Sequence, residues 1–194
     1  MMDLQDAALA TGGTTVGGQV LFSSVSTDSR AIRPGQLFVA LRGDRFDGHD
    51  YVTAVAAQGA VAAIVDKARA AANPVPLPLL IVDDTRLGLG RLAAGWRNRF
   101  ELPLIGVTGS NGKTSVKEMC AAILRAQARF DGLDPDLAVL ATQGNLNNDI
   151  GLPLTLLKLD ASHRAAIVEM GMNHPDEIAY LARIAQPSVA LVTN

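Results

Sequence analysis

A glycine-rich stretch between an apolar run and an amphipathic segment constrains this chain more than any other feature. Residues 106–114 read GVTGSNGKT; they follow Leu104-Ile105 and precede a segment with helical spacing of apolar residues. This order predicts a buried strand, a glycine loop and a helix that begins near Lys113. Such a loop directs successive backbone N–H groups toward one point at the positive end of the helix, so it favours phosphate binding.

Two side chains in the loop suit the same ligand. Lys113 is placed to reach the β- and γ-phosphates of a nucleotide, and the Thr114 hydroxyl is placed to ligate Mg²⁺. The match to G-x-x-x-x-G-K-[ST] is partial, because Val107 stands where the pattern has glycine. The alternative is a glycine-rich turn with a surface lysine. The predicted phosphate-binding residues are Thr108, Gly109, Ser110, Asn111, Gly112, Lys113 and Thr114.

The helix after this loop is expected to bury one apolar face. That face comprises Val116, Met119, Cys120, Ile123 and Leu124. Cys120 is the single cysteine of the chain, which excludes an internal disulfide, and its place on this face indicates a core residue rather than a nucleophile.

Composition limits the classes of function. The 194 residues are 48% hydrophobic and 4% aromatic, which suits one domain or two small ones with aliphatic cores. A net charge of −2 provides no basic face, so nucleic acid is not an expected partner. No apolar run approaches the ~20 residues of a membrane span, and the N-terminus lacks a signal peptide pattern. We expect a cytoplasmic monomer.

Residues 1–101 read as a first domain and 102–194 as a second, because Glu101-Leu102-Pro103 ends a helix. In the first, we expect a helix at 4–10, a second helix capped by Asp50, and a stiff connector at 73–78. Its expected strands span residues 20–22, 37–41, 60–65 and 79–82. Asp83-Asp84 precedes an amphipathic helix and indicates capping rather than a metal pair. The arginines of that helix, Arg86, Arg91, Arg97 and Arg99, are expected to be solvated.

In the second domain, short apolar strands alternate with helices. The predicted strands span residues 104–107, 137–141, 165–168 and 189–192. This alternation predicts an α/β fold with a parallel sheet and right-handed crossovers. Because ligands gather at the carboxyl ends of parallel strands, the polar residues that follow each strand are the candidates for a site.

Glu169 is the first of these candidates, since it comes directly after a buried strand. A carboxylate there could hold Mg²⁺ beside a Gly-Lys-Thr loop and neutralise a transferring phosphoryl group. The alternative is a cap for the next helix. That helix is already supplied with a cap, a first-turn proline and acidic residues by Asn173, His174, Pro175, Asp176 and Glu177. The metal interpretation is therefore favoured for Glu169, and capping is favoured for His174.

Two polar clusters have less specific patterns. Asn145, Asn147 and Asn148 follow Thr142 and suit amide or sugar recognition, although ordinary turns also prefer asparagine. The cluster Thr27, Asp28, Ser29 and Arg30 could hold a sugar or a diphosphate. Spacing alone favours an Asx-type turn with a solvated arginine there.

Taken together, these stretches resemble the Mur ligase family. The resemblance rests on TGSNGKTSVKEM (residues 108–119), TQGNLNNDIGLPLTLL (142–157) and VEMGMNHPDEIAYLARIAQPSVALVTN (168–194). TDSRAIRPGQLFVALRGDRFDGHDYV (27–52) resembles the uridine-nucleotide domain of the same family. The similarity covers nearly the whole chain, and it accounts for Val107, because the family's loop has this spacing.

The resemblance implies an ATP-dependent amide ligase of peptidoglycan precursor synthesis. ATP would phosphorylate the terminal carboxylate of UDP-MurNAc-tripeptide, and the amine of D-Ala-D-Ala would attack the acyl phosphate. The implied fold is a small α/β uridine-nucleotide-binding domain followed by the first part of a P-loop parallel-sheet ATPase domain. Sister ligases of the family, a folylpolyglutamate synthetase and a non-catalytic nucleotide-binding module remain as alternatives.

The resemblance also implies roles for individual residues. Residues 108–114 would bind ATP, Lys113 and Glu169 would be catalytic, and Thr114 and Glu169 would ligate Mg²⁺. The substrate-binding residues would be Thr27, Asp28, Ser29, Arg30, Thr142, Asn145, Asn147 and Asn148. The chain stops at Asn194, directly after a predicted strand, so we expect an N-terminal piece of a longer enzyme with little or no ligase activity.

Overall fold

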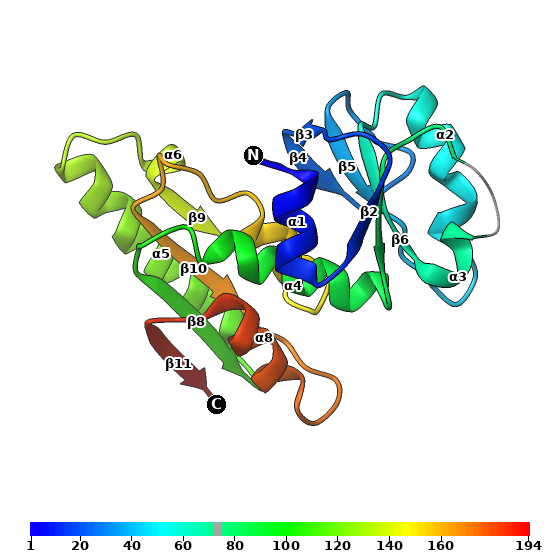
Figure 1. Cartoon of the computed structure of the whole chain (residues 1–194). Helices are drawn as coiled ribbons and strands as arrows, with labels where there is room; N and C mark the ends of the chain where they lie inside the picture. Colours follow the sequence, from blue (N-terminus) through cyan, green and yellow to red (C-terminus); the bar gives the residue numbers. More distant parts are fainter. Residues whose placement is uncertain (72–74) are drawn as a thin grey trace. The chain divides into compact units, whose positions relative to one another are not determined.

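In the computed structural model, which describes residues 1–71 and 75–194, the chain separates into two compact units (Figure 1). Unit 1 spans Met1–Gly95 and unit 2 spans Trp96–Asn194. The boundary lies inside helix α4 (Thr85–Arg97), and the division after residue 101 stays a prediction. Residues 73 and 74 of the expected connector lie outside the described residues.

Unit 1 is built on a five-stranded sheet in the order β2-β7-β6-β5-β4. All neighbouring strands are parallel except β2 and β7. The strands are β2 (Thr14–Val16), β4 (Ser24–Ser26), β5 (Gln36–Val39), β6 (Ala62–Asp66) and β7 (Leu79–Val82), with a separate pair β1 (Met2–Asp3) and β3 (Leu21–Phe22). The helices are α1 (Leu4–Thr11), the 3-10 turn η1 (Gly48–Tyr51), α2 (Val52–Ala57), α3 (Lys67–Ala70) and most of α4.

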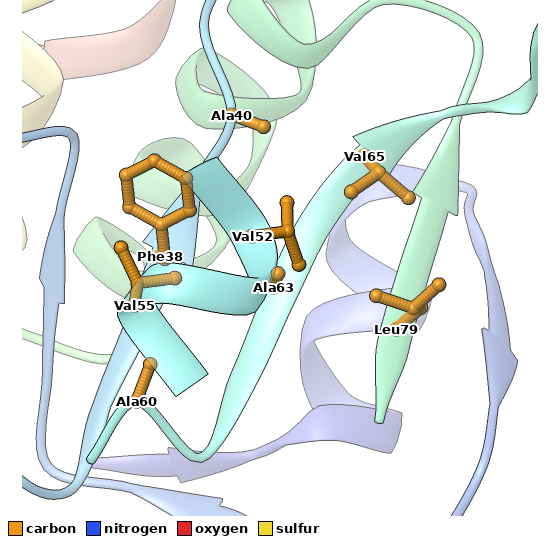
Figure 2. Packing of buried hydrophobic residues seen from close by; sticks show 8 residues of the cluster. All are labelled: Phe38, Ala40, Val52, Val55, Ala60, Ala63, Val65 and Leu79. Carbon is orange, nitrogen blue, oxygen red and sulfur yellow. The ribbon is translucent and has the colours of Figure 1, made fainter. Parts of the chain in front are cut away.

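A buried hydrophobic cluster holds unit 1 together (Figure 2). Phe38 from β5 and Ala63 from β6 meet Val55 from α2, and all three side chains are fully buried. Strands covered on both faces need near-continuous apolar residues, which explains the uninterrupted runs in β5 and β6. The predicted strand at 79–82 is confirmed, and the predicted strand at 37–41 ends two residues early, at Val39.

The capping predictions for unit 1 are partly correct. Asp84 caps α4 by accepting the backbone N–H groups of Arg86 and Leu87, as expected. Asp50 is not the cap of α2, so that prediction is wrong. The turn η1 comes before α2, and the Asp47 side chain caps it by accepting the N–H of His49 at 3.0 Å.

Unit 2 contains a fully parallel four-stranded sheet in the order β11-β8-β10-β9. The strands are β8 (Leu104–Gly109), β9 (Val139–Ala141), β10 (Ala165–Glu169) and β11 (Val189–Thr193), and the helices are α5 (Lys113–Phe130), α6 (Pro135–Ala138), α7 (Gly151–Leu156) and α8 (Glu177–Ala185). Residues 137 and 138, expected in a strand, are helical. Asp134 caps this short helix and Pro135 occupies its first turn, a combination that favours helix initiation.

Helix α5 packs on the sheet of unit 2 with only part of the predicted face. Val116, Cys120 and Leu124 pack against buried clusters of this unit, as predicted. Ala121 is buried against Val107 and Ile167, and Lys117 is also buried. Met119 and Ile123 are 64% and 69% exposed. The inward face is centred about half a turn from those two residues, where a lysine interrupts the apolar pattern.

The end of α4 contributes two buried side chains to unit 2. The Trp96 ring N–H donates to the Leu159 carbonyl at 2.9 Å. Arg97 is 8% exposed and donates to the carbonyls of Ala185, Phe100 and Leu102, and burial lowers its pKa. The expectation that Arg97 is solvated was therefore wrong. No helix among the described residues is both long and apolar enough to cross a membrane.

Replacing Phe38 with alanine tests the core of unit 1. The substitution leaves a cavity between β5 and α2, and we expect the free energy of unfolding of this unit to fall by about 3–5 kcal/mol. Urea unfolding followed by circular dichroism measures it. Phe46, which is 57% exposed, gives the matched control, and Phe46→Ala should change stability by less than about 0.5 kcal/mol. Equal effects of the two substitutions would contradict this account.

Candidate functional site

The carboxyl ends of four parallel strands meet at one edge of the unit 2 sheet. In the register, Glu169 of β10 lies beside Val107 of β8, and Thr193 of β11 lies beside Gly109. The phosphate-loop residues 110–112 leave β8 at this edge and lead directly into α5. The expected clustering of the polar residues that follow the strands is confirmed for three of them. Thr114, which follows β8, and Asn147, which follows β9, both contact Glu169 at the end of β10.

Backbone geometry explains two glycines of the loop. Gly109 has φ 132°, and a Cβ atom there would lie 2.1 Å from the Thr193 carbonyl oxygen. Gly112 has φ 80° and occupies the N-cap position of α5, where no side chain caps the helix. Residues other than glycine rarely adopt a backbone φ in this positive range, so glycine at these two positions permits the sharp turn. The first N–H groups of α5 are thus left without a capping side chain, as an anion site requires.

Lys113 folds back over this loop. Its Nζ donates to the Gly109 carbonyl at 2.7 Å and to the Ser110 carbonyl at 3.3 Å. These carbonyls are neutral acceptors, and phosphate oxygens would make stronger, charge-assisted bonds with the same ammonium. The lysine is therefore held beside the loop and can exchange its partners when an anion binds.

Glu169 is the centre of the polar contacts at this edge. Glu169 is buried, with 3% of its surface exposed. Oε2 accepts a hydrogen bond from the Thr114 hydroxyl at 2.9 Å, and Oε1 accepts one from the Asn147 side-chain amide at 2.9 Å. Its backbone N–H donates to the Thr142 hydroxyl at 2.9 Å. The structure thus unites Thr114, Glu169, Asn147 and Thr142, which lie far apart in the sequence.

The other asparagines of the run face different surroundings. Asn148 caps the start of α7, since its Oδ1 accepts the N–H groups of Ile150 and Gly151 at 3.2 and 2.8 Å. Asn145 is exposed, and its carbonyl accepts the Asn147 N–H at 2.8 Å. The substrate roles of these residues stay predictions.

Helix α8 is capped differently from the prediction. The Glu177 carboxylate, from the first turn of the helix, accepts the backbone N–H groups of Asn173 and His174 at 2.7 and 3.2 Å. These hydrogen bonds lower the pKa of Glu177. The expected caps Asn173 and His174 are therefore donors rather than capping acceptors. Glu169 takes no part in this cap, so its capping alternative is excluded.

In unit 1, the cluster at residues 27–30 follows the carboxyl end of β4. Arg30 and Asp28 form a bidentate ion pair, with Nε–Oδ1 and Nη2–Oδ2 both 2.9 Å. The Arg30 backbone N–H also donates to Asp28 at 3.0 Å, which is the geometry of an Asx turn. The hydrogen bonds from Arg30 lower the pKa of Asp28 to about 2. The role of Thr27, Asp28, Ser29 and Arg30 in substrate binding stays a prediction.

A metal at this site would depend on few protein ligands. Among the described residues, no group of three or more His, Cys, Asp or Glu side chains could hold a metal ion. One carboxylate and one hydroxyl at the end of a phosphate loop are instead the pattern of Mg²⁺ sites that share the ion with substrate phosphates.

One buried polar residue of this region escaped the sequence reasoning. Lys117 is 1% exposed and lies one helical turn after Lys113. The sequence signal for Lys117 was its position four residues after Lys113. Residues at this spacing share a helix face, so Lys117 could have been expected on the side of α5 that carries the loop lysine.

Two family models match the chain. The Mur ligase middle domain matches residues 107–194, and the model described as Mur ligase family, catalytic domain, matches residues 21–97. The UDP-N-acetylmuramoyl-tripeptide–D-alanyl-D-alanine ligase of Escherichia coli is 44% identical over 182 residues, which are 94% of this chain and 37% of the relative. The Bacillus subtilis ligase of the same name is 41% identical, with 91% and 36% covered.

Solved structures of MurF ligases are also similar to this chain. A MurF structure from Acinetobacter baumannii has TM-score 0.82 and 39% identity, and the match covers 97% of this chain and 40% of that one. A MurF ligase from Thermotoga maritima in complex with ADP has TM-score 0.72 and 32% identity, with 89% and 38% covered. The chain thus spans about two-fifths of the length of the relatives it matches.

The ion pair at residues 27–30 can be tested by NMR titration. Arg30→Met should return the pKa of the Asp28 carboxyl from about 2 toward its ordinary 3.8. Because the folded-state pKa lies below the unfolded one, the pair stabilises the chain above about pH 4, and this contribution is lost as the pH falls toward 2. Arg33→Met removes an exposed neighbouring charge and should leave the Asp28 pKa unchanged. An unchanged pKa in Arg30→Met would contradict the pairing.

Proposed function

Because this chain belongs to the Mur ligase family, we propose that it carries the nucleotide site of an ATP-dependent ligase that joins D-Ala-D-Ala to UDP-MurNAc-tripeptide. The observation that carries the proposal is the contact of Glu169 with Thr114 at the end of the phosphate loop. The names of the relatives support the reaction, and the ADP complex of one neighbour supports the nucleotide. Because this chain spans about two-fifths of the length of these ligases, we propose that it has little or no ligase activity alone.

The residues present fit a magnesium ion. Glu169 is buried, yet its carboxylate accepts hydrogen bonds from neutral groups, the hydroxyl of Thr114 and the amide of Asn147. A buried carboxylate usually pairs with a cation or binds a metal, because its charge is otherwise costly to remove from water. Neighbouring oxygens around octahedral Mg²⁺ lie about 3 Å apart. The oxygens of Thr114 and Glu169 are already 2.9 Å apart.

The proposed chemistry activates a carboxylate by phosphorylation. A carboxylate is a poor electrophile, and transfer of the γ-phosphoryl group from ATP gives an acyl phosphate with a good leaving group. The backbone N–H groups of residues 108–114 would hold the phosphates, and the Asn111 N–H would leave the Asn194 carbonyl to which it donates here. Lys113 would move from the loop carbonyls to the γ-phosphoryl oxygens. Bound Mg²⁺ would supply further neutralisation of the phosphate charge.

The remaining predicted residues are assigned to the substrate. Asn145 and Thr142 lie on the loop that follows β9, at the sheet edge that carries the phosphate loop. In unit 1, Thr27–Arg30 would contact the uridine diphosphate end of UDP-MurNAc-tripeptide. For that, the exposed Arg30 would exchange its Asp28 partner for a phosphate, a ligand that arginine also binds through two parallel hydrogen bonds. We propose a cytoplasmic location, since ATP and the UDP-linked substrate are cytoplasmic metabolites. We further propose that the protein is a monomer.

Two substitutions test the nucleotide site by calorimetric titration of the chain with ATP, with and without Mg²⁺. Lys113→Met should weaken ATP binding about 10–100-fold, because it removes a charge-assisted hydrogen bond to phosphate. Lys67→Met, which removes an exposed lysine paired with Asp83 in unit 1, is the matched control and should bind as the wild type does. Equal affinities of the Lys113 variant and the control would contradict the proposal.

Glu169→Gln should abolish the strengthening of ATP binding by Mg²⁺ while Mg²⁺-free binding persists. The variant also removes a buried charge that has neutral partners, so without metal its free energy of unfolding should equal or exceed that of the wild type. Urea unfolding measures this second quantity. A purely structural role for Glu169 would give the opposite pattern, with lower stability and an unchanged effect of Mg²⁺.

The amine specificity of the parent enzyme separates the family alternatives. With UDP-MurNAc-tripeptide and ATP, release of phosphate should require D-Ala-D-Ala, and single amino acids or glutamate with a folate acceptor should give none. The 194-residue chain alone, assayed in parallel, should release no phosphate by ligation. Activity with another amine would identify a sister ligase instead, and ligation by the chain alone would show that it is catalytically sufficient.

A further inference from the structure

Helix α5 buries a lysine that the proposed chemistry does not use. The Lys117 side chain is 2% exposed, and its Nζ donates to the Thr142 carbonyl at 2.9 Å and to the Glu118 carboxylate. A buried ammonium is costly unless its hydrogen-bonding capacity is satisfied, so this arrangement needs a compensating reason.

The pair with Glu118 does not supply that reason. The Glu118 side chain is 60% exposed, and its pKa is lowered chiefly by the hydrogen bond from Lys117. A lysine could make such a surface pair without being buried, and exposed pairs contribute little to stability. The contact that does require burial is the one with the Thr142 carbonyl, at the end of β9.

This contact completes a cycle of interactions around Glu169. Thr142 accepts the backbone N–H of Glu169 through its hydroxyl, and its own N–H donates to the Ile167 carbonyl. The Thr114 hydroxyl donates to the Glu169 carboxylate. The first turns of α5 therefore reach Glu169 twice, at the side chain through Thr114 and at the backbone through Lys117 and Thr142.

We propose that Lys117 is a positioning residue that fixes the backbone of Glu169 relative to Thr114 and thereby sets the magnesium affinity of the site. The inference rests on the proposed role of Glu169 as a metal ligand. Groups that orient metal ligands typically change metal affinity or activity 10–100-fold when they are mutated. Removal of Lys117 leaves the phosphate loop and both metal ligands in place but opens one side of the cycle.

The first test compares Lys117→Met with Glu118→Gln by calorimetric titration of the chain with ATP, with and without Mg²⁺. Methionine replaces the unbranched stem of lysine with one of similar shape that is one atom shorter, and it cannot donate to Thr142. We expect the Mg²⁺-dependent affinity for ATP to fall about 10–100-fold in Lys117→Met, while Mg²⁺-free binding stays unchanged. Glu118→Gln removes only the exposed ion pair and should behave as the wild type does.

The second test needs neither metal nor nucleotide. Amide hydrogen exchange of the metal-free chain should accelerate about tenfold or more at Glu169 and Thr142 in Lys117→Met, because the lost anchor permits local opening there. Amides elsewhere in β8 and β10 should keep their exchange rates. Should Lys117→Met not fold, Lys117→Gln replaces it, since its amide is one atom too short to reach the Thr142 carbonyl.

The outcomes separate the two proposals. If the wild-type chain shows no Mg²⁺-dependent ATP binding, the proposed function of the site fails, and the exchange rates at Glu169 and Thr142 still decide the positioning role. Binding by Lys117→Met with wild-type Mg²⁺ dependence would overturn the inference. Uniformly faster exchange throughout unit 2 would overturn it too, because it would show that Lys117 only stabilises the fold.

Discussion

The hydrogen bond between the Thr114 hydroxyl and the Glu169 carboxylate is the interaction on which the candidate site depends. It joins the start of α5 to the end of β10, across residues 55 positions apart in the sequence. Parallel pairing of β8 with β10 makes the contact possible, because it brings both strand ends to one edge of the sheet. The glycine loop after β8 then turns α5 so that its first side chains face Glu169.

Burial of the Glu169 carboxylate constrains the groups that surround it at this edge of the sheet. In a low-dielectric surrounding, an uncompensated charge is costly, and a cation placed beside it is bound strongly. Neighbouring groups therefore orient the carboxylate through neutral hydrogen bonds and leave its charge available. Asn147 is one of them, and Gly171 lets it approach, because a Cβ atom there would lie 3.1 Å from the Asn147 side-chain amide. This arrangement supports the proposal that the site binds a metal ion shared with phosphates.

Each of the two units carries a different part of the proposed binding site. Unit 2 supplies a fully parallel sheet and a helix that begins at a glycine loop, and the proposed phosphate site is built from the backbone of these elements. Unit 1 has its own aliphatic core around Phe38 and carries its polar cluster on an exposed turn stabilised by Asp28 and Arg30. The relatives, which are more than twice as long as the matched region, combine such units with further chain.

Local sequence was sufficient where one short segment decides the structure. The strand at 79–82, the capping of α4 by Asp84 and the strand–loop–helix around Lys113 were all predicted, because apolar runs, N-cap residues and glycines act within a few residues. The prediction of a strand at residues 137–141 was partly wrong although a local signal was present. Asp134 and Pro135 are typical of a helix start, and the chain is helical from Pro135 to Ala138.

By itself, the sequence determined an α/β chain with a parallel sheet and a glycine loop at the end of a strand, since hydrophobic spacing and glycine positions encode these features directly. Only the tertiary structure decided that α5 turns Lys117 inward and Met119 outward, and that Asn147 contacts Glu169 rather than solvent. The inward face of a helix depends on where the sheet lies. The partners of a buried carboxylate likewise depend on which strand ends are neighbours, and both are long-range properties that no single segment contains.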